Sequence, residues 1–381
     1  MATGVFNGQL NSNKIFGALY NMIISQTVFS DNIKGTYGDL ASKFKTDGTL
    51  YGDTKLFYAV DCLKSAPWGD YSEAENLLAV KKPDAPACQK VTIDQYRMIW
   101  ITLDNYLSKQ AWSTPEAFGQ FHSVVTGMLA DTKRVYESRL INVFVGNKVS
   151  TATKGTITVD LTTAASSAST QEESNRLQAQ TIAKDIADLL VDLKDTTRDY
   201  NEYGYLRSYN EDDFYYVWNS NYYNMITKLD LPTIFHKDGL VDKLNDNVLP
   251  AKYFGRALAE SDFGSGKVIG TDGAYDSTKG TIRAAKEFTY NNKHYFPGDA
   301  LATSGTYIGV VGGLEASSVY LETNDVICKI IHKSAVPFMS AFETETSFFN
   351  PRSLTENKYL IWGYSEPCTL YNYPFLTVQK I

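Results

Sequence analysis

The stretch TPEAFGQFHSVVTGMLADTKRVYESRLINVFVG, residues 114–146, predicts the longest helix of the chain. Thr114 suits an N-cap, Pro115 suits the first helical position, and Gly146 suits the C-terminal stop. Between them apolar residues recur at helical spacing: Phe118, Phe121, Val125, Met128, Val135, Leu140 and Val143. A helix of this span is about 45 Å long, so we expect a strut against which other elements lie.

The bulk composition is that of an ordinary globular protein. The chain has 381 residues, 43% of them hydrophobic and 21% charged, which favours two or three domains. Its net charge is -7, and no basic run exceeds the doublets Lys81-Lys82 and Lys133-Arg134. Such a charge distribution argues against a broad grip on nucleic acid. The 26 tyrosines and 19 phenylalanines are typical of large packed surfaces and interfaces.

No pattern in the sequence predicts catalysis, a cofactor or a metal site. The four cysteines lack C-x-x-C spacing, which predicts free thiols in a reducing compartment; they are Cys62, Cys88, Cys328 and Cys368. The four histidines form no zinc motif, and the glycines at 264, 266 and 270 lack the following helix that a phosphate loop needs. His236 is the most enzyme-like histidine, but no nucleophile is identifiable beside it.

The sequence predicts neither a secretory signal nor a membrane-spanning segment. Residues 1–10 have neither a charged region nor an apolar core, so no signal peptide is predicted. No apolar run reaches the length of a membrane span, and we expect a cytosolic protein. Residues 1–35 read as a loose arm with one short amphipathic helix, which needs a surface to lie on.

Two predicted strands flank a long connection. Leu56–Leu63 and Val91–Leu103 have strand patterns, and about 25 residues with Pro67, Trp68 and Tyr71 separate them. The second strand is apolar on both faces, which predicts that both faces are covered. The connection is either a flap on its own domain or an arm that reaches a partner.

The rest of the chain predicts a mixture of helices and strands. A strand at 156–161 precedes a flexible connection, a helix at 172–200, a strand at 214–218, a helix at 221–229 and a strand at 248–254. A Gly-rich β insert with strands at 305–311 and 318–321 follows, then strands at 326–332, 359–362 and 370–378. The last strand is expected to join a sheet built earlier.

Several phrases in this order resemble a known family. They are DTKRVYES (131–138) through Asn142, RDYN (198–201), GYLRS (204–208), VWN (217–219), PTIFHKDGL (232–240) and VLPAKYFG (248–255). From about residue 55 to the end the chain is similar to tailed-bacteriophage major capsid proteins of the Hong Kong 97-type fold.

The resemblance implies an α/β (mixed α+β) fold with named parts. These are an N-terminal arm and short helix (1–51), an extended two-stranded loop (52–105), a peripheral domain with a spine helix (106–171) and an axial domain (172–260). A β-rich insert (261–321) lies outside the family plan, and closing strands of the axial and peripheral domains (322–381) complete the chain. No scaffolding segment precedes the arm, so the resemblance implies a separate scaffolding protein.

The resemblance also implies function. Pentamers and hexamers would form an icosahedral shell around double-stranded DNA, without sequence-specific binding or a membrane, in a virion assembled in the host cytoplasm. Partners would be identical subunits, a scaffolding protein and a portal protein. Trp68, Tyr71, Phe57 and Tyr96 are the predicted interface residues, because aromatic anchors dominate binding energy. Two alternatives stay open: an encapsulin-type nanocompartment shell and an unrecognised soluble enzyme.

Overall fold

The computed structural model describes residues 40–46, 52–65, 82–104, 115–166, 168–228, 246–263, 279–290, 292–301 and 316–381. Contacts divide the chain into two units. Unit 1 comprises Met1–Thr36, Arg97–Val135 and Glu343–Trp362; unit 2 comprises Tyr37–Tyr96, Tyr136–Phe342 and Gly363–Ile381. The predicted turn glycines at 264, 266 and 270, the predicted strand at 305–311, the loose arm at 1–35 and His236 lie outside the described residues.

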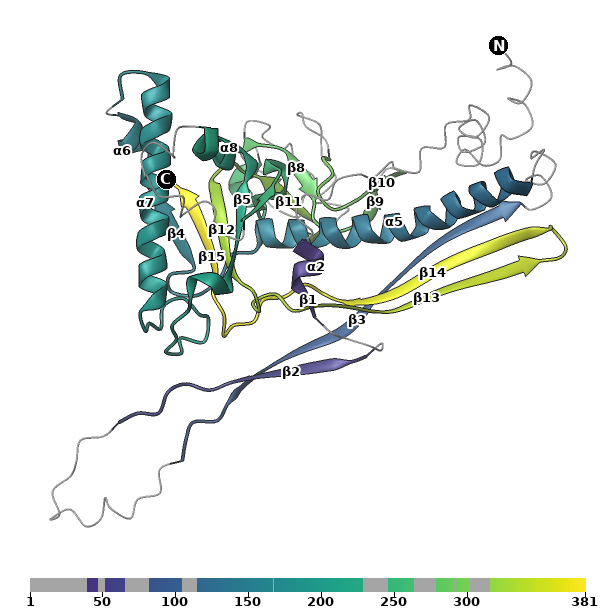
Figure 1. Cartoon of the computed structure of the whole chain (residues 1–381), viewed down its shortest axis with the longest axis horizontal. Helices are drawn as coiled ribbons and strands as arrows, with labels where there is room; N and C mark the ends of the chain where they lie inside the picture. Colours follow the sequence, from purple (N-terminus) through teal and green to yellow (C-terminus); the bar gives the residue numbers. More distant parts are fainter. Residues whose placement is uncertain are drawn as a thin grey trace. The chain divides into compact units, whose positions relative to one another are not determined.

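A five-stranded mixed sheet forms the centre of unit 2 (Figure 1). Its order is β4 (Thr156–Val159), β15 (Phe375–Lys380), β12 (Val326–His332), β5 (Phe214–Asn219) and β6 (Asp246–Leu249). β15 runs parallel to β4 and antiparallel to β12, so the last strand of the chain fills the gap between two earlier ones. The prediction that it joins an earlier sheet is confirmed, although the strand begins at Phe375 and not at residue 370.

Helix α7 (Gln171–Lys194) packs against one face of this sheet. The Thr170 hydroxyl accepts a hydrogen bond from the Glu173 amide, and the Glu173 carboxylate accepts one from the Ser169 amide, which fixes the helix start. The predicted apolar stripe is buried: Ile182, Ile186, Leu189, Leu190 and Leu193. Together with α8 (Ser220–Lys228) they share one core with sheet residues such as Tyr216, Ile330 and Val378. Helix α7 ends at Lys194, earlier than predicted, because the chain turns extended at Asp195.

The connection between β4 and α7 corrects a prediction. It contains the short helix α6 (Leu161–Ser166), where we expected a flexible segment. The Asp160 carboxylate accepts hydrogen bonds from the backbone amides of Thr162 and Thr163 and from both of their hydroxyls. These contacts lower the pKa of Asp160 to about 2. A carboxylate in the N-cap position starts the helix, so the Thr-rich composition was a poor guide here.

The last three turns of helix α5 (Pro115–Asn147) lie against the opposite face of the unit 2 sheet. The predicted helix is confirmed, including Pro115 at its first position. The Phe144 and Phe375 rings meet edge to face, with centroids 6.5 Å apart. The Lys329 Nζ, fully buried in β12, donates to the Lys148 carbonyl and to the Thr377 hydroxyl, both at 2.8 Å. Lys329 therefore ties the end of α5 to the centre of the sheet.

Gly146 does not stop this helix, as the sequence predicted it would. It lies within α5, where a Cβ atom would come 2.1 Å from the Tyr253 carbonyl oxygen. The helix ends one residue later at Asn147, whose side-chain Nδ2 donates to the Val143 carbonyl at 2.8 Å and to the Tyr253 carbonyl at 3.3 Å. Gly146 is needed because the backbone at residue 253 passes too close for any side chain.

A second five-stranded sheet has the order β1 (Lys45–Thr46), β13 (Phe338–Asn350), β14 (Thr355–Ser365), β3 (Ala87–Asp104) and β2 (Thr54–Ala59). Strand β1 follows the short helix α2 (Leu40–Phe44). Strands β2, β3 and β14 are where the sequence predicted strands, with β2 shorter and β14 longer than expected. Strand β13 was not predicted.

Short strands occur in and beside the predicted β insert, and β11 confirms the strand predicted at 318–321. A three-stranded sheet has the order β7 (Gly255–Arg256), β11 (Val319–Glu322), β8 (Ile282–Ala284), and β9 (Phe288–Tyr290) pairs with β10 (Lys293–Tyr295). The strand predicted at 248–254 ends at Leu249. Pro250, which has no amide hydrogen, then leads into the single 3-10 turn Ala251–Tyr253, so the longer strand was wrong. Further 3-10 turns are Glu211–Asp213, Glu260–Asp262 and Ala316–Ser318.

The close approach at Gly146 gives a first test. We expect Gly146→Ala to lower the free energy of unfolding of the unassembled subunit by about 2 kcal/mol or more, because the new Cβ meets backbone that cannot rotate away. Gly127→Ala in the same helix is the matched control. Nothing lies within 4 Å of its Cβ position, so that change should be neutral or stabilising by up to about 1 kcal/mol. Equal effects of the two substitutions in denaturant unfolding would contradict this packing.

Lys329 gives a pH test. Desolvation lowers its pKa from the ordinary 10.5 to about 7. Between these values the unfolded chain binds a proton that the folded chain does not, so the free energy of unfolding rises with pH across this window. Lys329→Met should remove a few kcal/mol of that rise, whereas Lys184→Met, on the exposed face of α7, should leave it in place. Unfolding curves measured from pH 7 to pH 10 check this, and an unchanged slope in Lys329→Met would refute it.

Candidate assembly surface

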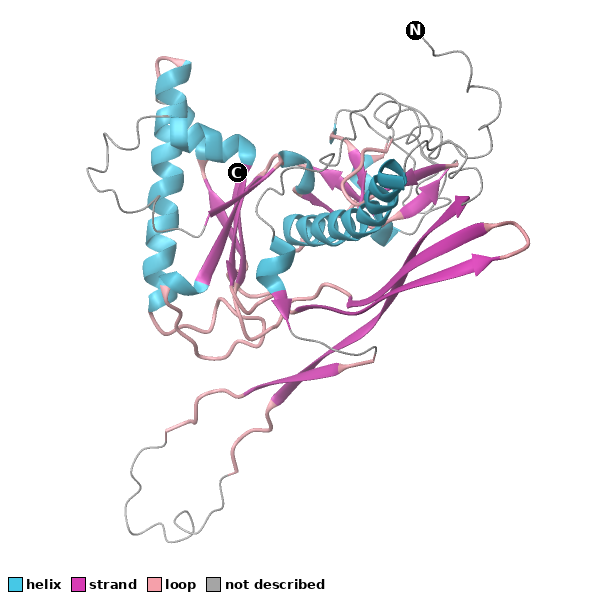
Figure 2. Cartoon of the chain, turned by 45° about the vertical axis from the view of Figure 1, so that its right-hand side comes forward, coloured by secondary structure: helices cyan, strands magenta, loops and turns pink. Residues whose placement is uncertain are grey.

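We define the β2–β3 ribbon as Thr54–Ala59, which pair with residues 87–92, together with residues 93–96 of β3; all of them belong to unit 2 (Figure 2). One face of this ribbon is exposed in the described part of the chain. The antiparallel register sets Leu56 opposite Lys90 and Tyr58 opposite Cys88. Because side chains alternate along a strand, the even-numbered residues of both strands share a face. The burial pattern alternates accordingly, with the even-numbered residues more exposed than their neighbours.

This even-numbered face of the ribbon carries exposed apolar side chains among polar ones, which include Lys90 and Asp94. Leu56 is 50% exposed, Tyr58 65% and Tyr96 46%. In unit 1 the same face of β3 continues with Met98 and with Trp100, which is 64% exposed. The prediction that both faces of this strand are covered is therefore wrong for the single chain. Several exposed apolar side chains on one face mark an interaction surface more often than a single one does.

The odd-numbered face is covered within unit 2 itself. Phe57 is half-buried and packs against the core cluster formed by Val91, Ile93, Met339 and Leu370. Of the predicted interface residues, Tyr96 thus lies on the exposed face and Phe57 on the covered one. Trp68 and Tyr71 lie outside the described residues. Sequence reasoning missed Leu56 and Tyr58, because apolar residues at both 56 and 57 hide the two-residue period that separates the faces.

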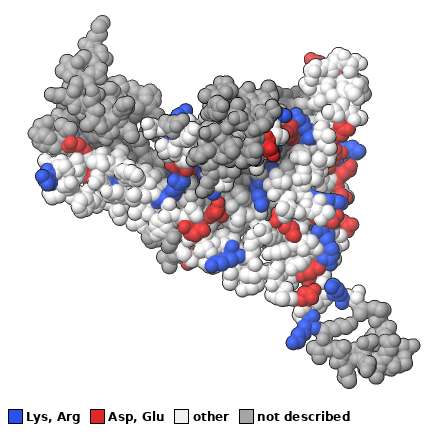
Figure 3. Space-filling view, turned by 180° about the vertical axis from the view of Figure 1, so that it is seen from behind, with Lys and Arg blue, Asp and Glu red and all other residues white. Residues whose placement is uncertain are grey.

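Charged side chains are mixed over the surface. Figure 3 shows acidic and basic groups interspersed on the face in view, without a continuous basic field. The predicted wet face of α7 supplies part of this mixture, since Lys184, Asp188, Asp192 and Lys194 are exposed. Elsewhere charges pair, as Lys133 does with Glu343 at 2.5 Å in unit 1 and Arg139 with Asp299 at 2.8 Å in unit 2. Such a surface suits contacts between proteins better than a grip on phosphates.

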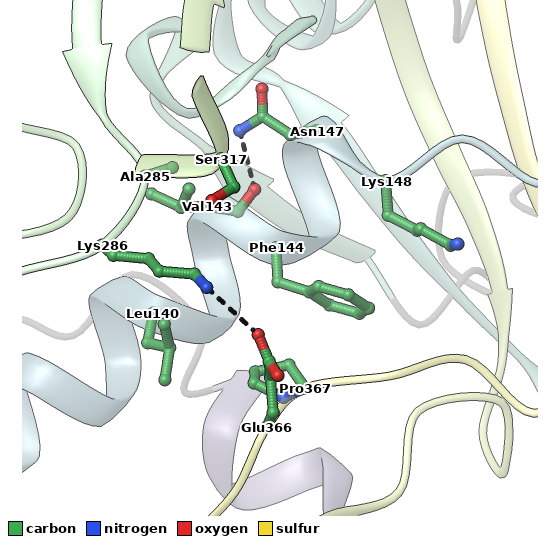
Figure 4. Close-up of a pocket in the computed structure, with 10 residues that line it drawn as sticks. All are labelled: Leu140, Val143, Phe144, Asn147, Lys148, Ala285, Lys286, Ser317, Glu366 and Pro367. Carbon is green, nitrogen blue, oxygen red and sulfur yellow. Dashed lines mark hydrogen bonds and ion pairs between the residues drawn. The ribbon is translucent and has the colours of Figure 1, made fainter. Parts of the chain in front are cut away.

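A small cavity of about 260 Å³ lies in unit 2, beside the last turns of α5 (Figure 4). Leu140, Val143 and Phe144 form its apolar wall, and the Lys286 ammonium lies 3.3 Å from the Glu366 carboxylate across it. Both of these charged residues are at least half exposed, and neither is paired with a nucleophile in the cavity lining. The cavity therefore offers apolar surface without the paired groups that catalysis requires.

Other chemical groups are dispersed through the described residues. No three His, Cys, Asp or Glu side chains within the described ranges come together as metal ligands. All four cysteines are free thiols, as predicted. Among the helices described, none combines the length and the apolar character that a membrane crossing requires.

Two solved structures show the fold. The chain is similar to one in the capsid structure of Staphylococcus phage Andhra, with a TM-score of 0.57 and 11% identity over 92% of this chain and 86% of that chain. It is also similar to a chain in the structure of the head fibre and inner core protein of native bacteriophage P68, with a TM-score of 0.58 and 12% identity over 91% and 86%. At such low identity these likenesses establish the fold alone: a mixed α/β fold of the Hong Kong 97 type.

Sequence comparison identifies the family. No curated protein matches the chain significantly. The family model for Phi29-like phage major capsid protein, however, matches residues 1–372. This match confirms the predicted resemblance and virion location, and it excludes the nanocompartment and enzyme alternatives, because the family is a structural one. The chain belongs to the Phi29-like phage major capsid protein family, whose members assemble with identical subunits into the icosahedral head of the virion.

Proposed function

We propose that the β2–β3 ribbon, with residues 60–86 beyond it, is the extended loop of the capsid subunit and lies across a neighbouring copy in the shell. The observation that supports this most directly is the uncovered apolar face of Leu56, Tyr58 and Tyr96. Keeping such side chains in water costs about 25 cal/mol per Å² of apolar area, which a second subunit removes by covering them. Obligate interfaces between subunits are large and apolar in the same way.

We further propose how the remaining elements fit the capsid plan. Helix α5 serves as the spine helix of a peripheral domain, and the sheet with α7 and α8 serves as the axial domain. The sheet draws β4 from segment 106–171, β5 and β6 from 172–260, and β12 and β15 from 322–381. The axial domain would therefore combine strands from three of the predicted segments. The β insert would be an elaboration of the subunit surface.

The proposed assembly consists of pentamers and hexamers around double-stranded DNA. The net charge of -7 and the interspersed surface charges support enclosure of DNA without sequence-specific binding. A scaffolding protein and a portal protein are proposed as further partners, because a closed shell of defined size needs a template and an entrance for the genome. Assembly would take place in the host cytoplasm.

Deleting residues 66–86 tests the role of the extended loop. Ala59 pairs directly with Ala87, so residues 60–65 remain as a connection of ordinary hairpin length. We expect a folded subunit with an unchanged unfolding midpoint that forms no closed shells. Electron microscopy and sedimentation of the purified protein check this. Intact shells made from the deletion protein would refute the proposed role.

Replacing the exposed apolar side chains tests the ribbon face itself. We expect the double substitution Leu56→Ser with Tyr58→Ser to lower shell yield about tenfold or more, because truncating central interface residues costs about 2 kcal/mol each. Val191→Ser is the matched control, since Val191 is 67% exposed but lies on α7, away from the ribbon strands. Shell yield measured by sedimentation should stay normal in the control. A normal yield in the double variant would count against the ribbon face as an interface.

A further inference from the structure

The segment that follows β2, residues 60–65, is bonded to the rest of unit 2 through the carboxylate of Asp61. Asp61 Oδ2 lies 2.5 Å from Arg198 Nη1, while Asp61 Oδ1 accepts hydrogen bonds from the Leu206 amide at 3.0 Å and from the Cys62 amide at 2.8 Å. The Leu206 amide first, and then Arg198, lower the pKa of Asp61 to about 2. Asp61 is therefore ionised at neutral pH.

Arg207 forms a further hydrogen bond to the segment that follows β2. Its Nη2 donates to the Val60 carbonyl at 2.5 Å, and its Nε donates to Asn372 Oδ1 at 3.2 Å. The segment that carries both arginines is itself braced, because Thr197 and Arg207 exchange backbone hydrogen bonds and Arg198 donates to the Gly204 carbonyl. Two guanidinium groups are thus presented to the ribbon root from a pre-formed turn.

The returning strand is held by Gln89 of β3. Gln89 Nε2 donates to the Thr369 carbonyl at 2.7 Å, and Gln89 Oε1 accepts from the Tyr371 amide at 3.0 Å. The Tyr371 carbonyl in turn accepts from the Glu202 amide at 2.9 Å. Both strands of the ribbon are therefore fastened to the same body, formed by residues 197–207 and 369–372 of unit 2.

These bonds lie near the end of the ribbon at which the pairing between β2 and β3 stops. Residues 60–65 and 82–86 form no strand pairs, so beyond Ala59 and Ala87 the ladder no longer sets the direction of the chain. Isolated surface ion pairs contribute little to stability. Fastening both strands through several directional bonds instead fixes an orientation, which is what a loop must have to meet a neighbour.

We propose that Asp61, Gln89, Arg198 and Arg207, here called the root joint, are positioning residues that set the direction of the extended loop for shell assembly. The proposal rests on the proposed function of that loop as a contact between subunits. It assigns to the joint an effect on assembly that exceeds its effect on folding. A subunit that has lost the joint should fold normally and assemble badly.

Asp61→Ala and Asp61→Asn test the outgoing strand in the full-length chain. Hydrogen exchange at the Cys62 and Leu206 amides of the unassembled subunit, which donate to Asp61, should rise about tenfold or more in Asp61→Ala, with the global unfolding midpoint unchanged. Asp61→Asn keeps an acceptor for the Leu206 and Cys62 amides, so its exchange should fall between Asp61→Ala and the native chain. Yields of closed particles, measured by electron microscopy, should follow the same order.

Gln89→Ala is a second variant, which loosens the returning strand without touching Asp61. It should likewise raise exchange at the Tyr371 amide, which donates to Gln89, and lower particle yield. Asp160→Ala is the matched control: Asp160 is another strongly hydrogen-bonded carboxylate, but it caps α6. It should assemble as the native chain does.

The outcomes distinguish a failure of the root joint from a failure of the proposed role of the extended loop. Unchanged exchange in Asp61→Ala and Gln89→Ala would show that the joint holds nothing. Raised exchange with native particle yield would show that loop direction does not matter for assembly, and it too would overturn the proposal. If the chain lacking residues 66–86 forms intact shells, the proposed function fails; if only the joint variants do, the joint alone fails.

Discussion

The buried end of helix α5 is the constraint on which the rest of unit 2 depends. Its last turns lie on the central sheet, where Phe144 meets Phe375 and Lys329 reaches the Lys148 carbonyl. Gly146 lets the chain at Tyr253 pass within reach of the helix backbone. These contacts join α5 to β12, to β15 and to the turn before β7. Segments far apart in sequence are thereby held as one body before any partner is met.

The chemistry of the side chains does not by itself indicate the function of this subunit. The described residues hold no metal cluster, and the cavity beside α5 lacks paired reactive groups. What the subunit presents instead is surface, above all the exposed side chains of Leu56, Tyr58 and Tyr96 on one face of the ribbon. A major capsid protein needs this kind of design, because its work is to bury area against copies of itself.

Sequence reasoning succeeded where one physical signal dominated. The helical period across 115–147 and the apolar run of β12 gave elements that the structure confirms closely. Strand β13 was not predicted because its middle reads Glu-Thr-Glu-Thr-Ser, which has no apolar alternation. Its pairing with β1 and β14 stabilises the extended conformation. Gly146 was misread because a close backbone approach leaves no trace in sequence. The predicted interface residues Tyr96 and Phe57 lie on different faces for a similar reason. Because apolar residues occur on both faces of the ribbon, the sequence does not show that Tyr96 is exposed and Phe57 is covered.

The central claim is that the ribbon face is covered by a neighbouring subunit in the head. A cryo-electron microscopy map of the assembled shell tests it most directly. The account predicts that Leu56, Tyr58 and Tyr96 are buried against a second copy, with Asp61 still bonded to Arg198 of its own chain. A map in which these three side chains face solvent in every subunit would contradict it.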